Sequence, residues 1–436
     1  MYNKNLITEK KLAELKIKRE AMYNERFKDV EEQFGKEIVD AMKYLYSIYD
    51  EKMYLWLAGL WEPEIGAFYY SNSARDTEGY LPDIESTMQA LTFLETSGIF
   101  AAREGEVESK IYHKMRSSIC EYAKGLQDPD GYFYHPQWGK NITTSRRGRD
   151  LGWAMGAITE YGGTPNYPSP IDKKADTDAP STLLPEHLQT VENLRKYLSE
   201  LDLEHNSYWV GNLIQSQARQ IKAAGPEFVD EVIKWYYDNQ HPENGLWQSE
   251  LSYGATNGLM KVCLAMSAFD KRIPNPAAAM RSCFEIMLKE GGDALTTAIT
   301  SFYNPWITIK MLFGNMKKFG DTELAEELKA EFLEKAAAMI RSTTDKVLRF
   351  KKPDGGFSYG QKYSSRTSQG APAAVPESPE GDVNGNGLSS TGVIHNVFGA
   401  LGVPIIPFYT KEDGEFFFEL IANSYPSKKI NPKPEI

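Results

Sequence analysis

The chain has 436 residues, of which 41% are hydrophobic and 25% are charged, and its formal net charge is −11. This composition is typical of a soluble globular protein that buries a large core. The negative charge argues against binding to a nucleic acid duplex, which requires a basic surface.

The beginning of the chain predicts neither secretion nor insertion into a membrane. Residues 1–30 are rich in lysine and glutamate and lack the apolar stretch of a signal peptide. The chain contains no run of about 18 apolar residues, which a membrane-spanning helix requires. Its three cysteines form no CxxC pair, which favours a reducing compartment. We therefore expect a cytoplasmic protein.

Three parts of the chain are expected from composition and periodicity. Residues 1–45 are expected to form a long charged helix on the outside of the protein or at one end. Residues 46–425 are expected to form a single domain, and residues 426–436 a C-terminal tail.

Six similar units follow one another within this domain. Each unit combines a charged helix, a turn rich in Pro, Asp and Gly, a short aromatic extended piece, and a polar residue before an apolar helix. The turn segments are 61–70, 126–133, 203–210, 241–247, 291–293 and 352–357. A repeat of this length is typical of arrays in which neighbouring units bury each other's faces.

The helices between the turns differ in their apolar pattern. Residues 322–341 place Leu324, Leu328 and Phe332 on one face at i, i+4 spacing, which predicts an amphipathic outer helix. Four segments are apolar nearly all round and are predicted to be buried inner helices: 87–96, 151–158, 259–268 and 391–401. The two patterns together predict an all-α fold, an (α/α)6 toroid in which six helical hairpins close into a ring.

Two long segments have no periodicity. Residues 161–186 contain five prolines, and residues 358–382 are rich in Ser, Pro and Gly. Long irregular loops in a compact domain usually serve function. We expect both on the rim of a central funnel, as lids or as interfaces.

Segments 127–133 and 353–357 resemble the repeats of prenyltransferases and of squalene- and terpene-type cyclases. Asp83-Ile84-Glu85-Ser86 is similar to the Asp-x-Asp-Asp motif of class II terpene cyclases, although its last carboxylate is absent. The zinc ligands of protein prenyltransferases have no recognisable counterpart here. Toroidal glycoside hydrolases and polysaccharide lyases are similar in their aromatic and polar character. The resemblance implies a helical toroid and leaves the reaction open.

In a toroid the starts of the inner helices converge at one end of the ring, so residues at those starts share a cavity. The predicted catalytic residues are Asp83, Glu85, Asp150, His205, Tyr208 and Asp382. The predicted substrate-binding residues are Arg149, Asn206, Trp209, Tyr253, Asn257, Tyr303, Asn304, Trp306 and Asn384.

These residue types suit two ways of breaking a glycosidic bond. Hydrolysis requires two carboxyl groups across the bond, for which the aspartates and Glu85 are candidates. β-Elimination requires a base and a group that neutralises the substrate carboxylate. His205, Tyr208 or Tyr253 would be the base, and Asn206 or Arg149 the neutralising group.

Structural roles remain open for the same residues. Each aspartate can be a helix cap, His205 a structural hydrogen-bonding residue, and each tryptophan part of the core. The basic run 146–149 is expected to be a solvated surface turn. The segment from Asp382 to Gly387 begins like a calcium loop, but its twelfth position is Val393 and lacks the required Glu.

The sequence therefore predicts a carbohydrate-active enzyme that cleaves an oligosaccharide in the funnel, by acid/base hydrolysis or by β-elimination. One alternative is a class II terpene-cyclase-like enzyme that acts on an isoprenoid with Glu85 as the protonating acid. Another is a ligand-binding toroid without catalysis. No metal or cofactor is expected, and the expected partner is a small molecule or an oligosaccharide, with neither nucleic acid nor membrane. The oligomeric state stays open.

Overall fold

The structure is a computed structural model that describes residues 1–170, 185–289 and 298–430. It is mostly helical, in agreement with the predicted all-α class. Among these residues the only sheet is a hairpin of two short strands, β1 (Trp61–Glu62) and β2 (Ala67–Phe68). None of the described helices combines the length and apolar composition that crossing a bilayer requires.

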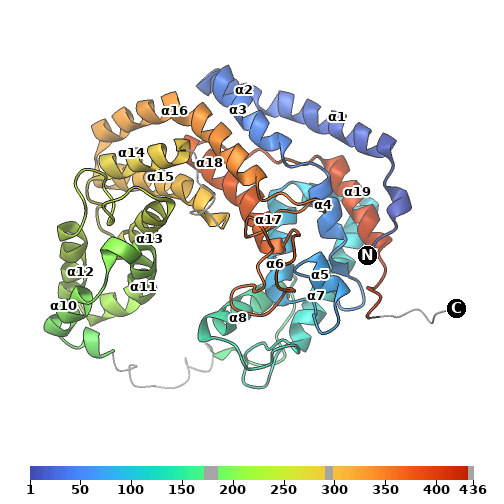
Figure 1. Cartoon of the computed structure of the whole chain (residues 1–436). Helices are drawn as coiled ribbons and strands as arrows, with labels where there is room; N and C mark the ends of the chain where they lie inside the picture. Colours follow the sequence, from blue (N-terminus) through green and yellow to red (C-terminus); the bar gives the residue numbers. More distant parts are fainter. Residues whose placement is uncertain (171–184, 290–297, 431–436) are drawn as a thin grey trace.

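The single charged helix expected over residues 1–45 is wrong. The segment forms a short 3-10 turn and three helices: η1 (Lys4–Leu6), α1 (Glu9–Arg26), α2 (Lys28–Phe34) and α3 (Lys36–Ser47). Phe27 lies at the break between α1 and α2, and its ring is buried in the core. Gly35 follows the last residue of α2 with a φ of 83°. Helix α1 lies along the outside (Figure 1), but α3 packs against the long helix α16 and buries one face.

From residue 52 onward, helices of two sets alternate along the chain. The first set is α4 (Lys52–Ala58), α7 (Glu106–Gly125), α10 (Val191–Ser199), α12 (Pro226–Asp238), α14 (Pro276–Leu288) and α16 (Thr322–Leu348). The second set is α6 (Ile84–Thr96), α8 (Thr144–Thr159), α11 (Leu203–Ala224), α13 (Tyr253–Phe269), α15 (Thr300–Phe319), and α17 (Val383–Gly387) with α18 (Val393–Leu401). A π-helical turn, Leu388–Gly392, joins α17 to α18. Figure 1 shows α12, α14 and α16 at the margin, with α11, α13, α15 and α18 nearer the middle.

Four further described elements lie outside these two sets. They are α5 (Asn72–Asp76), η2 (Ile99–Glu104), η3 (Glu186–Leu188) and α19 (Lys411–Ala422). Three of them are short, and the fourth, α19, is the last described helix and packs against η2, α7 and α4. Helices of the second set contact one another in series, from α8 through α6, α17, α18, α15 and α13 to α11. Among the described residues, the two ends of this series, α8 and α11, share no extensive contact.

Most helices predicted from apolar pattern are confirmed. Segments 87–96, 259–268 and 322–341 lie within α6, α13 and α16, and 391–401 spans the end of the π-helical turn and α18. Segment 151–158 lies in α8, but α8 begins at Thr144, where the Thr143 side chain accepts the Arg146 N–H. The basic run 146–149 is therefore helical, and the expected solvated turn is wrong.

Four of the predicted turns share one conformation, with a glycine at positive φ: Gly66, Gly131, Gly245 and Gly355. The chain pairs across Gly66, Gly131 and Gly355 in short antiparallel contacts, for example between Lys351 and Phe357. A Cβ on Gly245 would collide with the backbone of Ala279 in α14, and a Cβ on Gly355 with Lys52 in α4. The turn of the sixth unit therefore seats on the first helix of the first unit.

Two predicted units differ from this pattern. The third segment, 203–210, is helical within α11, apart from non-helical backbone at Asn206. The fifth, 291–293, lies outside the described residues, as does most of the predicted loop 161–186. The predicted loop 358–382 is irregular as expected.

Candidate functional site

A cavity of about 540 Å³ lies where several helices of the second set meet. Its wall comes from α6, α8, α11, α15, the loop before α17, and the segment from α17 to α18. Its lining residues that carry a polar side-chain group are Gln89, Thr92, Thr96, Arg149, Trp153, Tyr208, Thr300, Tyr303, Tyr359, Gln369, Asn384, Thr391 and His395. The rest are Phe93, Val383, Gly387, Leu388 and Gly392. Four predicted site residues are on this wall: Arg149, Tyr208, Tyr303 and Asn384.

Glu85 lies directly behind the wall. It is the second residue of α6, and its side chain is fully buried. Its carboxylate accepts hydrogen bonds from Arg149 Nε at 2.9 Å, Trp153 Nε1 at 2.8 Å and Gln89 Nε2 at 2.8 Å, and from Arg149 Nη2. The carboxylate does not line the cavity itself, but all three of its partners do.

Asp83 and Asp150 share one buried guanidinium. Arg146 Nη2 donates to Asp83 at 3.0 Å, and Arg146 Nε donates to Asp150 at 2.8 Å. Asp83 also caps α6, because its carboxylate accepts the Ser86 N–H at 3.1 Å. Asp150 lies in the second turn of α8, so its predicted place at a helix start is wrong.

Burial raises the pKa of Asp150 to about 7, although Arg146 opposes the shift. The neighbouring Asp83 charge raises it further, because one cation serves two carboxylates. None of the three side chains lines the cavity, so the role of this cluster is to join α6 and α8 inside the protein.

Asp382 is the cap of α17, and its carboxylate is also fully occupied. It accepts the N–H groups of Gly385 and Tyr359, both at 2.7 Å, and the hydroxyl of Tyr70 at 2.9 Å. Burial raises the pKa of Asp382 to about 6. Its bond to Tyr359 holds the loop 358–382 against the cavity, where Tyr359 and Gln369 lie on the wall.

Three tyrosines on the wall come from separate parts of the chain: Tyr208 from α11, Tyr303 from α15 and Tyr359 from the loop. Burial raises the pKa of Tyr303 to about 12, and the nearby phenols of Tyr359 and Tyr208 add to the shift. Burial also raises the pKa of Tyr208. Both phenols therefore keep their protons at neutral pH and can donate them.

His395 on α18 was missed from the sequence. It lines the cavity, and its Nδ1 lies 3.1 Å from the Thr391 carbonyl oxygen. A carbonyl oxygen only accepts, so Nδ1 donates this hydrogen bond, and in a neutral ring that leaves the lone pair on Nε2. The sequence did carry a signal for it. His395 is one of only six histidines, and it lies inside the mostly apolar inner helix predicted over 391–401.

Three predicted residues on α11 are not on the wall. The His205 side chain is 76% exposed and binds Asp202, Asn206 is exposed, and Trp209 is 58% exposed. Successive residues of an α-helix point about 100° apart. Tyr208 can therefore line the cavity while its neighbour Trp209 does not.

Four other predicted residues lie in or between α13 and α15. Trp306 is fully buried, and its Nε1 donates to Thr343 at 3.0 Å, so its predicted contact with substrate is wrong. Tyr253 is also buried and packs edge-on against Phe302. Asn304 donates to Asn257 at 3.0 Å, which joins the two helices away from the wall.

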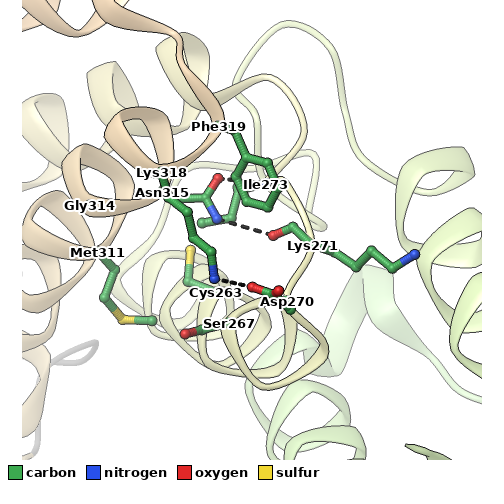
Figure 2. Close-up of a pocket in the computed structure, with 10 residues that line it drawn as sticks. All are labelled: Cys263, Ser267, Asp270, Lys271, Ile273, Met311, Gly314, Asn315, Lys318 and Phe319. Carbon is green, nitrogen blue, oxygen red and sulfur yellow. Dashed lines mark hydrogen bonds and ion pairs between the residues drawn. The ribbon is translucent and has the colours of Figure 1, made fainter.

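A second hollow, of about 230 Å³, lies at the other ends of α13 and α15 (Figure 2). Its charged and amide groups are bonded to their neighbours: Lys318 pairs with Asp270, and Asn315 donates to the Lys271 carbonyl at 3.1 Å. It holds none of the predicted site residues, and we assign it no role in the site.

In the part of the chain that the structure describes, no group of three or more His, Cys, Asp or Glu side chains could hold a metal ion. Comparisons with known proteins found no matching family, no similar curated protein and no similar solved structure. The candidate site therefore depends on the geometry of the cavity.

Proposed function

We propose that the chain is a carbohydrate-active enzyme that cleaves a glycosidic bond beside a uronate by β-elimination in the central cavity. The observation that carries this proposal is the composition of the wall. Its described residues include a histidine with a free lone pair, three phenols and one guanidinium, but no carboxylate. Hydrolysis needs two available carboxyl groups, whereas the four predicted ones, Asp83, Glu85, Asp150 and Asp382, are buried and do not line the cavity.

The groups on the wall supply each part of an elimination. His395 Nε2 removes the proton from the carbon beside the uronate carboxylate, and a carbon–carbon double bond forms as the bond to the glycosidic oxygen breaks. A protonated phenol, Tyr303 or Tyr208, donates its proton to the leaving oxygen. Arg149 and Asn384 donate hydrogen bonds to the substrate carboxylate, which stabilises the charge that develops there.

We further propose that the fold is an (α/α)6 toroid. Six alternating helix pairs, the contact between α17 and α6, and the sixth turn seated on α4 support a ring. Helices α8 and α11, the ends of the contact series, both contribute side chains to the same cavity. A terpene cyclase, which needs an almost wholly apolar cavity, is less favoured because thirteen of the eighteen wall residues carry a polar side-chain group. The cytoplasmic location expected from the sequence stays a prediction.

The test is incubation with a panel of uronate oligosaccharides and neutral glycosides. We expect a product with the ultraviolet absorbance of an unsaturated uronate. His395→Gln is expected to slow its formation about a hundredfold or more, because general-base catalysis is lost. His205→Gln, a change at an exposed histidine off the wall, is the matched control and should leave the rate unchanged.

Other outcomes would overturn the proposal. Plain reducing sugar without unsaturation means hydrolysis. Binding of sugars without any product means a ligand-binding toroid. Full activity of His395→Gln removes His395 from the mechanism.

A further inference from the structure

We infer that Glu85 is a positioning residue that holds Arg149 and Trp153 as a binding subsite for the pyranose ring of a uronate. This inference rests on the proposed function, because it names what the wall between α6 and α8 recognises. Glu85 would act on the substrate only through these two neighbours.

The geometry begins with spacing. Arg149 and Trp153 are four residues apart on α8, so they lie on the same face of that helix. Glu85 comes from α6, which packs against α8. One carboxylate oxygen, Glu85 Oε2, accepts both Arg149 Nε at 2.9 Å and Trp153 Nε1 at 2.8 Å. The orientation of the guanidinium and of the indole ring is therefore set by the same buried atom.

Arg149 and Trp153 both bind Glu85, and each still presents groups to the cavity that a ligand can contact. Arg149 uses Nε and Nη2 on Glu85, its Nη1 has no partner among the described residues, and its side chain is 39% exposed. Trp153 uses its one N–H on Glu85 and is half-buried on the cavity wall. A guanidinium edge binds a carboxylate, and a fixed indole face packs against the C–H groups of a sugar ring.

A third partner of Glu85 points to a missing hydrogen bond. Gln89 donates through Nε2 to Glu85 at 2.8 Å, whereas its Oε1 is shielded and has no partner among the described residues. A buried acceptor without a donor is unfavourable. Gln89 lines the same cavity, so a small rotation of its amide would expose Oε1 to a hydroxyl of the bound ring, which would provide the missing donor.

Glu85 is poorly suited to transfer a proton itself. Its two oxygens already accept four hydrogen bonds, and it does not face the cavity. Protonation would break contacts that hold three wall residues. This arrangement differs from the sequence-based prediction of Glu85 as a catalytic acid.

The test is a double-mutant cycle on binding, measured by calorimetry with oligogalacturonate, oligoglucuronate and oligomannuronate as probes. All variants carry His395→Gln so that the probes are not consumed. We expect Glu85→Gln to weaken binding of at least one probe about tenfold or more, because two groups lose charge-assisted bonds. In a protein that also carries Arg149→Met and Trp153→Ala, Glu85→Gln should have almost no further effect.

A merely structural Glu85 would weaken binding equally in both backgrounds, and that additive result overturns the inference. Glu62→Gln is the matched control: Glu62 is a buried carboxylate that accepts the Ser427 N–H at 2.9 Å, away from the cavity. It should not change the affinity. If Glu85→Gln does not fold, Trp153→Phe removes the indole N–H with its pyrrole ring and keeps a six-membered aromatic ring, and unchanged affinity in that variant likewise overturns the link.

The outcomes separate this inference from the proposed function. If the double-mutant cycle shows coupling but the unsubstituted protein cleaves no probe, the proposed function is overturned and the inferred subsite stands. Cleavage with an additive cycle overturns the subsite and keeps the function. If none of the probes binds, both fail.

Discussion

Two arginines on α8 pair with carboxylates from α6, and their surroundings differ. Arg146 is fully buried between Asp83 and Asp150, whereas Arg149 pairs with Glu85 and remains 39% exposed at the cavity. Arg146 and Arg149 are only three residues apart on α8, yet the first ion-pair cluster is closed to solvent and the second borders the cavity. Both arginines pair with carboxylates, so the pairing itself does not distinguish a structural ion pair from one in a binding site. Access to the cavity distinguishes them, because only Arg149 lines it.

The largest expected loss of stability comes from the buried cluster of Arg146, Asp83 and Asp150. Arg146→Met leaves two buried carboxylates without their shared cation, and we expect the free energy of unfolding to fall by about 3–5 kcal/mol. Urea denaturation measures this change. Arg147→Met, a substitution at the next residue along α8, removes a cation–π contact with Tyr132 and should lower stability by about 1 kcal/mol or less. A small effect of Arg146→Met would remove the distinction between the clusters.

The pH dependence of stability tests the same cluster. The pKa of Asp150 is about 7 in the folded chain against 3.8 for a free aspartate, so the folded state binds more protons between these values. The stability contributed by Asp150 is therefore lost as pH rises from about 4 to 7, by up to about 1.4 kcal/mol per pH unit.

Asp150→Asn, which cannot titrate, isolates this contribution. We expect the wild-type protein to lose stability relative to Asp150→Asn over that pH range, as measured by denaturation at several pH values. A constant difference between the two proteins would contradict the raised pKa. Asp382, with a pKa of about 6, should behave in the same direction in a separate Asp382→Asn comparison.

On the cavity side the expected loss of stability is smaller. Arg149→Met removes two donors from Glu85, but water in the cavity can approach the vacated position. We expect a loss of roughly 1–2 kcal/mol in unfolding free energy, together with weaker binding of uronate probes. A loss as large as that of Arg146→Met would mean that Arg149 is mainly structural.

The smallest expected change in stability is that of Trp153→Phe. It removes one of four donors from Glu85 and keeps an aromatic ring on the wall, so we expect about 1 kcal/mol or less. Thermal denaturation provides the measurement. A much larger loss would indicate that the indole packs as core rather than as part of the cavity wall.

Local chemistry explains what could be predicted. Asp83 and Asp382 are caps because a short carboxylate before an apolar helix accepts its first free N–H groups. The glycine turns follow from positions that need positive φ. The prediction failed for Asp150, where Thr143 provides a cap seven residues earlier, and for Trp306, whose apolar bulk and aromatic surface favour core and ligand contact alike.

Most of the predicted helices, the caps Asp83 and Asp382 and the glycine turns follow from the amino-acid sequence alone, because they depend on interactions within a few residues. Only the tertiary structure decided which polar residues share a cavity. Glu85 and Arg149 are 64 residues apart in the chain, and an error of one residue in a helix turns a side chain by about 100°. That rotation separates Tyr208 on the wall from Trp209 off it, and packing between helices sets it.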